Sequence, residues 1–193
     1  RKENHEKRVA FIIYDNPPGE DNLGSAGYID TFASLKTVFA EMRRLGYHIS
    51  SLPENEALHE YLLARNLVNN PGWQDPAAAL AGGKSLDTAG YRELLSEMVS
   101  GIEVTGAWGD PPGDIMTAEG RLILPAAQFG NILLAVQPSR GYHSDPDTLT
   151  HDKTLPPHHQ YTGFYRWLEE HWQPDCIVHV GTHGTLEFLK GKE

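Results

Sequence analysis

The sequence contains a single cysteine, Cys176, among its 193 residues. One thiol cannot form an internal disulfide, and this scarcity is typical of proteins in a reducing compartment. Basic residues are also few, because 16 lysines and arginines stand against 26 aspartates and glutamates, a net charge of −10. Such a surface repels phosphate groups, so we expect no nucleic-acid partner. Both observations favour a cytoplasmic protein.

Long apolar segments are missing as well. No stretch reaches the roughly 18 apolar residues that predict a membrane-spanning helix. Residues 1–8 are almost all polar, which is unlike a signal peptide. The first residue is arginine rather than methionine, and we therefore expect a fragment of a larger chain. With 39% apolar and 22% charged residues, the sequence can still bury a core.

Several common catalytic motifs are absent. The sequence has no GxxxxGK[ST] loop for ATP and no GxGxxG loop for a dinucleotide. It also lacks HExxH, CxxC and GxSxG. Cys176 lies in an apolar run, where we expect it to be buried and inert. Any chemistry must therefore come from other groups.

Apolar runs alternate with helical periodicity along the chain. The runs predict strands over 9–14, 47–52, 122–124, 132–136 and 176–180. Spacings of three and four predict helices over 29–42, 56–68, 91–99 and 158–172, with a short helix or a loop over 77–81. Three glycines and two prolines predict a loop over 105–114, with a possible internal boundary in a chain otherwise taken as one unit, 1–193.

This alternation predicts an α/β fold, with a doubly wound, mostly parallel sheet and helices on both faces. We expect 9–14, 29–42 and 47–52 to form a β-α-β unit, and 9–14, 132–136 and 176–180 to be interior parallel strands. Ligands of such sheets bind beyond the carboxyl ends of the strands. Loops 15–28, 137–157 and 181–187 leave these ends, so we expect them to gather on one side.

Histidine is concentrated near the C-terminus. Six of the ten histidines lie in the last 43 residues: His151, His158, His159, His171, His179 and His183. The neutral imidazole is the common metal ligand and a proton acceptor near neutral pH. Chance and surface placement are the alternative explanation.

The last predicted strand leads directly into two candidate catalytic groups. His183 lies between two glycines just after the strand, and Glu187 follows about one helical turn later. This spacing suits a base and its partner. Glu187 could instead stabilise a helix dipole. His179, inside the strand, could be an ordinary core histidine.

Further candidates lie before the last predicted helix. His158 and His159 follow two prolines at its N-terminus, where the helix dipole favours the free base over imidazolium. They could bind a metal or accept a proton, or they could simply cap the first turn. Arg140 could hold a carboxylate or form a surface ion pair. Tyr142 could line a flat apolar site or belong to the core.

Several spaced segments occur together in this sequence: Leu23–Gly27, Gln137–Tyr142, Asp145–Pro146, Leu155–His159, Tyr165–Leu168 and His179–Phe188. In this order they resemble the large, tetrapyrrole-binding subunit of cobaltochelatase and magnesium chelatase. The resemblance covers roughly 8–50 and 115–193, whereas 70–114 matches no recognised part of that family. The family usually has a proline before its final Gly-Lys, which Lys190-Gly191-Lys192 lacks.

The resemblance implies part of an ATP-dependent metal chelatase of the ligase class. Its substrates would be a tetrapyrrole and a divalent metal, Co²⁺ or Mg²⁺. The segment Leu155–His159 leans to the cobalt type and cobalamin biosynthesis, whereas Gly181–Phe188 leans to the magnesium type; cobalt is favoured. The resemblance also implies that ATP is used by an AAA-type ATPase subunit, that a further chelatase subunit takes part, and that the isolated fragment is inactive.

Metal insertion requires an ion to lose water and two pyrrole N–H groups to lose protons. The expected catalytic residues are Glu187 and His183. The expected metal ligands are His183, His158, His159 and His179, and the expected tetrapyrrole contacts are Arg140, Gln137, Tyr142 and Gly24. The alternative function is a non-catalytic α/β module that binds a small anionic ligand or a partner subunit.

Overall fold

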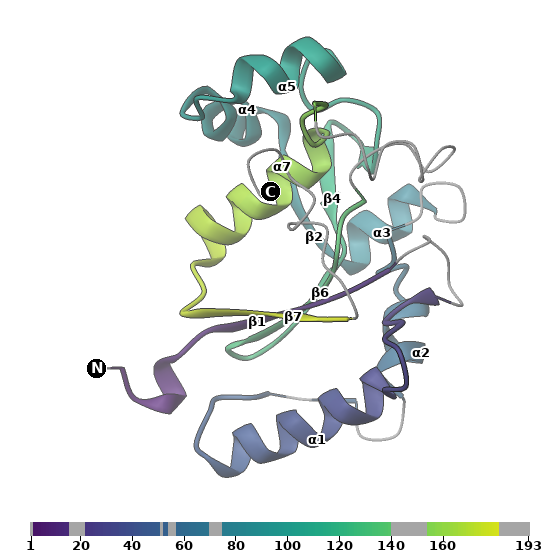
Figure 1. The fold of residues 1–193 in the computed structure, drawn as a ribbon, viewed down its shortest axis with the longest axis vertical. Helices are drawn as coiled ribbons and strands as arrows, with labels where there is room; N and C mark the ends of the chain where they lie inside the picture. The colour runs from purple at the N-terminus through teal and green to yellow at the C-terminus, as the bar shows by residue number, and fades with distance from the viewer. Residues whose placement is uncertain are drawn as a thin grey trace.

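The structure, a computed structural model, describes residues 2–15, 22–50, 52–53, 57–69, 75–139 and 154–181. Its helices and strands are η1 (Asn4–Glu6), β1 (Val9–Ile13), α1 (Thr31–Arg44), α2 (Leu58–Leu63), α3 (Pro76–Gly82), β2 (Lys84–Asp87), α4 (Thr88–Ser96), α5 (Gly101–Trp108), β3 (Thr117–Ala118), β4 (Arg121–Leu124), β5 (Ala126–Phe129), β6 (Ile132–Val136), α7 (His159–Trp167), η3 (Leu168–Trp172) and β7 (Cys176–Val180). Figure 1 shows α1 on one side of the central sheet and α7, α4 and α5 on the other.

The central sheet has four strands in the order β5-β6-β1-β7. Strands β6, β1 and β7 are parallel, and β5 pairs antiparallel with β6 as a hairpin. The predicted sharing of one sheet by 9–14, 132–136 and 176–180 is therefore confirmed. The interior position expected for 176–180 is wrong, because β7 ends the strand order and Cys176 and Ile177 are exposed. Cys176 is thus neither buried nor central.

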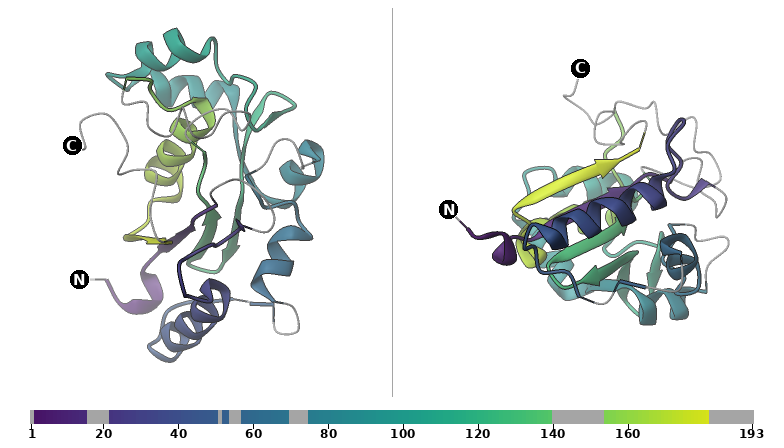
Figure 2. Two further views of the ribbon diagram at one scale, coloured as in Figure 1. Left: turned by 45° about the vertical axis from the view of Figure 1, so that its right-hand side comes forward. Right: turned by 90° about the horizontal axis from the view of Figure 1, so that it is seen from below.

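Both faces of this sheet are covered, which confirms the α/β class. Successive side chains of a strand point to opposite faces. On one face Phe11 packs edge-to-face on Phe39 of α1, with ring centroids 5.1 Å apart. On the other face Ile12 packs in a cluster with Phe164 of α7 and Tyr91 of α4. Figure 2 shows the two layers from other sides.

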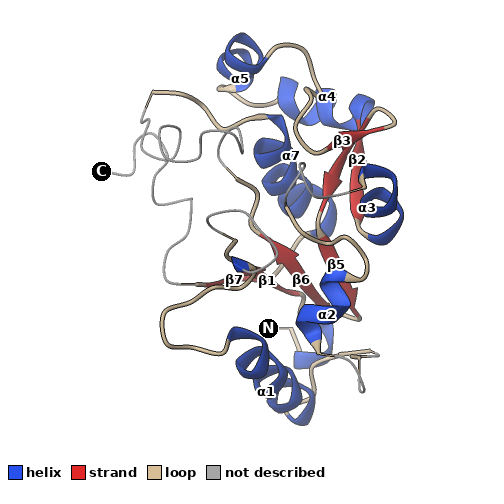
Figure 3. Cartoon of the chain, turned by 90° about the vertical axis from the view of Figure 1, so that its right-hand side faces the viewer, coloured by secondary structure: helices blue, strands red, loops and turns tan. Residues whose placement is uncertain are grey.

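A second sheet was not expected from the sequence. It has the antiparallel order β2-β4-β3 and lies beside α7 and α4 (Figure 3). The strand predicted over 122–124 is confirmed as β4, but it belongs to this small sheet. Strands β2, β3 and β5 are two to four residues long and have no clear alternation, so periodicity did not reveal them.

The strand predicted over 47–52 is wrong for its described residues, 47–50 and 52, which are irregular. The segment instead crosses the β5–β6 turn, where the Asn131 amide donates to the carbonyl of His48 at 2.9 Å. Gly130 permits this approach, since a Cβ there would lie 2.8 Å from that carbonyl oxygen. Strand β1 pairs in parallel with β6 and β7 and not with residues 47–52. The predicted β-α-β unit over 9–52 is therefore wrong.

The helix predictions are correct where the apolar residues keep a helical period over several turns. They are less accurate at the helix ends. Helices α1, α3, α4 and α7 confirm the predictions within a few residues. Helix α2 ends at Leu63 rather than at Val68, because Asn66 adopts a left-handed conformation with φ of 52°. The Leu67 amide then donates to the carbonyl of Leu62, which closes the helix C-terminus.

The loop expected over 105–114 begins later than predicted. Helix α5 continues to Trp108 and ends at Gly109, which has φ of 76°. Gly106 lies inside the helix, which continues past it, since an isolated glycine only weakens a helix. The possible internal boundary near 105–114 stays a prediction.

Candidate functional site

The described parts of the three predicted loops leave the same edge of the central sheet. Ile13 of β1 pairs in register with Val136 of β6 and Val180 of β7. Beyond them the Gln137 amide donates to Ile13 at 2.9 Å, and the Tyr14 amide donates to Val180 at 3.1 Å. The carboxyl ends of the parallel strands are therefore level, at the edge where α/β sheets bind ligands.

Four predicted site residues, Arg140, Tyr142, His183 and Glu187, lie outside the described residues, in 140–153 and 182–193. Their roles, and the spacing expected between Gly24, Arg140 and His183, stay predictions. The described candidates are Gln137, Gly24 and three histidines, which the structure places as follows.

Gln137 follows β6 directly and is buried, with 3% of its surface exposed. Its amide nitrogen donates to the hydroxyl of Tyr165 on α7 at 2.8 Å, and the same hydroxyl donates back to its amide oxygen at 3.1 Å. Burial raises the pKa of Tyr165, so the hydroxyl keeps its proton. Gln137 therefore fixes the tip of the Tyr165 ring at the carboxyl edge.

His179 of β7 lies on the same face of the sheet as α7. It pairs in register with Ile12, whose side chain packs in the cluster under α7. Its imidazole stacks on the ring of Tyr165, with centroids 6.3 Å apart and planes 20° apart. The residue is exposed overall, yet desolvation of the stacked ring lowers its pKa. His179 is thus held neutral near neutral pH.

Within the described ranges no hydrogen bond engages either ring nitrogen of His179. This separates it from the other two candidate histidines. An imidazole that is neutral, partly exposed and without hydrogen-bonded nitrogens can bind a metal or accept a proton.

His158 is the N-cap of α7, and only 1% of its surface is exposed. Its Nδ1 accepts a long hydrogen bond from the Tyr161 amide at 3.4 Å, and its Nε2 lies 3.5 Å from the Ser139 hydroxyl. Trp108 packs edge-to-face on the ring. His158 therefore does cap the first turn of α7, as one of the two alternatives proposed. Its second nitrogen also connects α7 to Ser139, in the segment that follows β6.

His159, the next residue, faces inward and is 2% exposed. Its Nδ1 lies 2.9 Å from the hydroxyl of Tyr91, and its Nε2 lies 2.9 Å from the carbonyl oxygen of Gly109. A carbonyl only accepts, so Nε2 carries the hydrogen and Nδ1 accepts from the tyrosine. Burial lowers the pKa of His159, which favours this neutral form. Both nitrogens are used in joining α7 to α4 and to the end of α5.

Gly24 lies in the β1–α1 connection with φ of +72°. Its amide donates to the Tyr14 carbonyl at 2.8 Å, and its carbonyl accepts from the Thr31 hydroxyl at 2.6 Å. A Cβ at this position would lie 2.8 Å from the Phe32 ring. The glycine is required for the tight turn that begins α1 next to the carboxyl edge.

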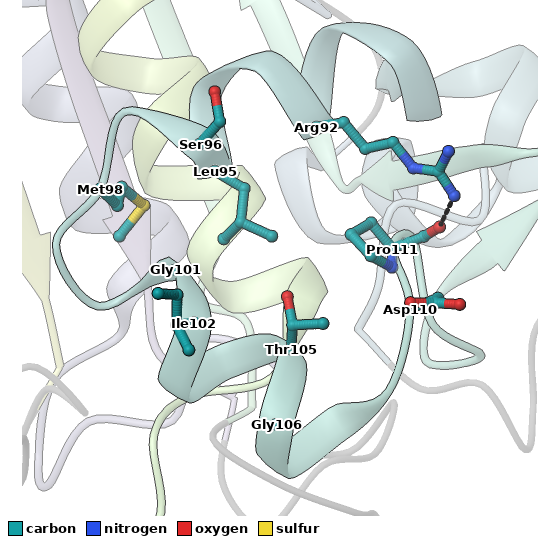
Figure 4. A pocket seen from close by; sticks show the side chains of 10 residues that line it. All are labelled: Arg92, Leu95, Ser96, Met98, Gly101, Ile102, Thr105, Gly106, Asp110 and Pro111. Atoms are coloured by element: carbon teal, nitrogen blue, oxygen red, sulfur yellow. Dashed lines mark hydrogen bonds between the residues drawn. The ribbon is translucent and has the colours of Figure 1, made fainter.

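Two hollows lie on the described surface around α5. One, of ≈ 350 Å³, lies between α5 and α7 and touches the Tyr165 ring; it is lined by Met98, Ser100, Glu103, Val104, Leu155, Pro156, Pro157, Tyr161, Thr162, Tyr165 and Arg166. The other is a groove of ≈ 820 Å³ on α4 and α5, and none of the described site candidates lines either hollow. Figure 4 shows it, with Arg92 donating to the carbonyl of Pro111. The smaller hollow shares Tyr165 with the carboxyl edge, because the hydroxyl of this residue is bonded to Gln137.

The described residues contain no group of three or more His, Cys, Asp or Glu side chains placed to hold a metal ion. A complete ligand set would therefore need groups from outside the described ranges. No helix among the described residues is long and apolar enough to cross a membrane.

Sequence reasoning missed Tyr165. The sequence places it in a predicted helix and in one of the segments that carry the family resemblance, and no local signal distinguishes its role from that of Tyr161. Its contacts with Gln137 and His179 depend on how β6, β7 and α7 pack together in the fold.

The molecule is therefore an α/β protein with a neutral histidine at the carboxyl edge of its parallel strands. The profile of the family CobN/Magnesium Chelatase matches residues 1–193, so the middle of the chain is covered as well. This chain belongs to the CobN/magnesium chelatase family.

Individual relatives agree. The chain is 33% identical to the magnesium-chelatase subunit ChlH of rice, Oryza sativa subsp. indica, over 100% of its length and 13% of that protein. It is 33% identical to the aerobic cobaltochelatase subunit CobN of Sinorhizobium sp, over 100% of its length and 15% of that protein. The catalytic subunit of cobaltochelatase from Mycobacterium tuberculosis has a similar structure, with a TM-score of 0.75 and 30% identity over 99% of this chain and 16% of that one. The chain thus spans about a sixth or less of these relatives.

Proposed function

We propose that this chain is the part of an ATP-dependent chelatase subunit that binds a tetrapyrrole and receives the divalent metal at the carboxyl edge of its central sheet. The observation that supports this most is His179, a neutral imidazole at that edge without hydrogen bonds to its nitrogens in the described residues. Family membership supports the reaction class.

The chemistry follows from what insertion requires. The ion binds four ring nitrogens, while two pyrrole N–H bonds break and two protons leave. We assign the approaching metal to His179 and His183, because both nitrogens of His159 are already bonded. Glu187, a few residues beyond β7, would accept protons from the macrocycle, with His183 as its partner.

The tetrapyrrole itself would be held by the segment after β6. Gln137 is buried at the strand end, and Arg140 and Tyr142 follow it within five residues. A guanidinium suits the carboxylate side chains of a tetrapyrrole. Gly24 would let the β1–α1 turn approach the ring. His158 would shape the site through Ser139.

We favour cobalt over magnesium as the substrate metal. Imidazole nitrogen suits Co²⁺, whereas Mg²⁺ prefers oxygen ligands and keeps its water. ATP would be hydrolysed by an AAA-type partner subunit, together with a further chelatase subunit, since this sequence has no ATP-binding loop of its own. A cytoplasmic location and a role in cobalamin biosynthesis are part of the same proposal, as is inactivity of these 193 residues alone.

The test is a reconstitution of the full-length subunit with its ATPase partner. Tetrapyrrole binding is followed by fluorescence quenching, and insertion is followed by the change in the visible absorption bands, with Co²⁺ and Mg²⁺ in parallel and with ATP present or omitted. We expect ATP-dependent insertion that is faster with Co²⁺. A protein that binds neither metal nor tetrapyrrole would contradict the proposal and favour a non-catalytic module.

A further inference from the structure

We propose that Tyr165 is a positioning residue, whose ring fixes the orientation of the His179 imidazole for the incoming metal. This inference rests on the proposed function, because it gives His179 contact with the metal. The tyrosine would not touch the metal itself. It would act only through the ring that stacks on it.

The first step is that Tyr165 is itself immobilised. Its hydroxyl is bonded twice to the Gln137 amide, at 2.8 Å and 3.1 Å. Its ring contacts Tyr161 at 5.0 Å and Phe164 at 5.1 Å between centroids, the second edge-to-face. The tip and the sides of the ring are therefore held by β6 and by its own helix.

The second step is that, among the described residues, His179 makes no side-chain hydrogen bond and one ring contact, with Tyr165. Strand pairing with β1 fixes its backbone but does not set the plane of the imidazole. In the described part of the chain, the stacked Tyr165 ring is the contact that defines the imidazole plane, at 20° between the two planes. Offset stacking of this kind is favourable at such centroid distances.

The third step concerns metal sites in general. A metal-binding histidine is usually oriented by a hydrogen bond from its second nitrogen to a carboxylate or carbonyl. His159 has such a bond, to the Gly109 carbonyl, but it is buried. His179 lacks one within the described residues, so ring stacking would take over the orienting role and leave both nitrogens available.

The experiment measures Co²⁺ binding to the full-length protein without tetrapyrrole, by the absorption of the bound ion. Tyr165→Leu removes the stacked ring, and Tyr165→Phe retains it without the hydroxyl. Tyr61→Phe, on α2 with its ring against Arg65, is the matched control. We expect Tyr165→Leu to weaken Co²⁺ binding roughly 10-fold or more, as loss of an orienting group usually does. Tyr165→Phe keeps the stacked ring and its contacts with Tyr161 and Phe164, so it should lose much less affinity than the leucine variant, and Tyr61→Phe should be unchanged.

A double-mutant cycle with His179→Ala shows whether the effect passes through the histidine. In the alanine background Tyr165→Leu should have no further effect on Co²⁺ binding. An equal loss in both backgrounds, or a phenylalanine variant as weak as the leucine one, would overturn the inference. Should the leucine variant fail to fold, Tyr165→Met fills the space without a ring.

Metal insertion by the same variants separates this inference from the proposed function. We expect Tyr165→Leu to raise the KM for Co²⁺ and to leave the Kd for tetrapyrrole unchanged, a split that a general loss of stability would not produce. A wild-type protein that inserts no metal but shows the coupling in Co²⁺ binding would contradict the proposed function and support the inference. Insertion with no coupling would contradict the inference alone.

Discussion

The hydroxyl of Tyr91 on α4 donates a hydrogen bond of 2.9 Å to Nδ1 of His159 at the start of α7, and both residues are buried. The two rings also meet edge-to-face, at 5.5 Å between centroids. Because the Gly109 carbonyl uses the other nitrogen, this one imidazole connects three segments that are far apart in sequence. The contact stabilises the position of α7, and thereby of Tyr165.

Replacement Tyr91→Phe should destabilise the chain, because it leaves Nδ1 of His159 buried without a donor. An unsatisfied buried acceptor costs about 1–3 kcal/mol. Urea unfolding monitored by tryptophan fluorescence would measure the loss. Tyr28→Phe, on a fully exposed tyrosine, should change the free energy of unfolding very little. Equal effects of the two replacements would show that the hydrogen bond contributes nothing.

Stability should fall as the pH is lowered from 7.5 to 5.5. Burial lowers the pKa values of His159 and His179 below their ordinary 6.5 in the folded chain. Below that value the unfolded chain binds more protons than the folded one, so protonation favours unfolding. The stabilisation is complete above the unfolded pKa and is lost as the pH falls toward the folded pKa.

The window stays above the ordinary carboxyl pKa values, 3.8 for aspartate and 4.5 for glutamate, so Asp175 and Glu41 contribute little. Urea unfolding at several pH values provides the measurement, and His179→Gln should reduce the pH dependence. A free energy of unfolding that is constant or higher at pH 5.5 would contradict the assignment of neutral, desolvated histidines.

Two glycines inside helices should respond oppositely to alanine. In α7, a Cβ on Gly163 would lie 2.5 Å from a methyl carbon of the buried Leu122, so Gly163→Ala forces either that side chain or α7 to shift. Overpacking of this kind costs about 1–3 kcal/mol. In α5, Gly106 has open space, and Gly106→Ala should stabilise by about 0.4–1 kcal/mol. Thermal unfolding compares them, and two changes of the same sign would refute the described packing of α7.

The sequence predicted the three parallel strands of the central sheet because they are largely apolar runs, whereas β5 at one end of the sheet was missed. In β1 and β6 all five residues are buried, and such runs have few other interpretations. The segment 47–52 is only half apolar, and the carbonyl of His48 is bound by the β5–β6 turn, a tertiary contact that the local pattern does not contain. The short strands of the second sheet likewise form only by pairing with one another, and a local sequence pattern does not show that pairing.

The candidate site was predictable by region but not by residue. His158 and His159 are adjacent and chemically identical in sequence, yet the first caps α7 and the second is enclosed against Tyr91. A difference of about 100° around the helix axis separates them. His179 was treated as an ordinary core histidine or a ligand, and only the register of β7 against β1 shows that it faces Tyr165.

The most direct test of chemistry at the carboxyl edge is the insertion rate of Glu187→Gln in the complete chelatase complex. Glutamine keeps the size of the side chain and removes its charge and basicity. We predict that insertion slows by roughly 100-fold or more, the usual contribution of a general base, while tetrapyrrole binding stays near that of wild type. Insertion at the wild-type rate would contradict the account, since Glu187 would then not be the proton acceptor.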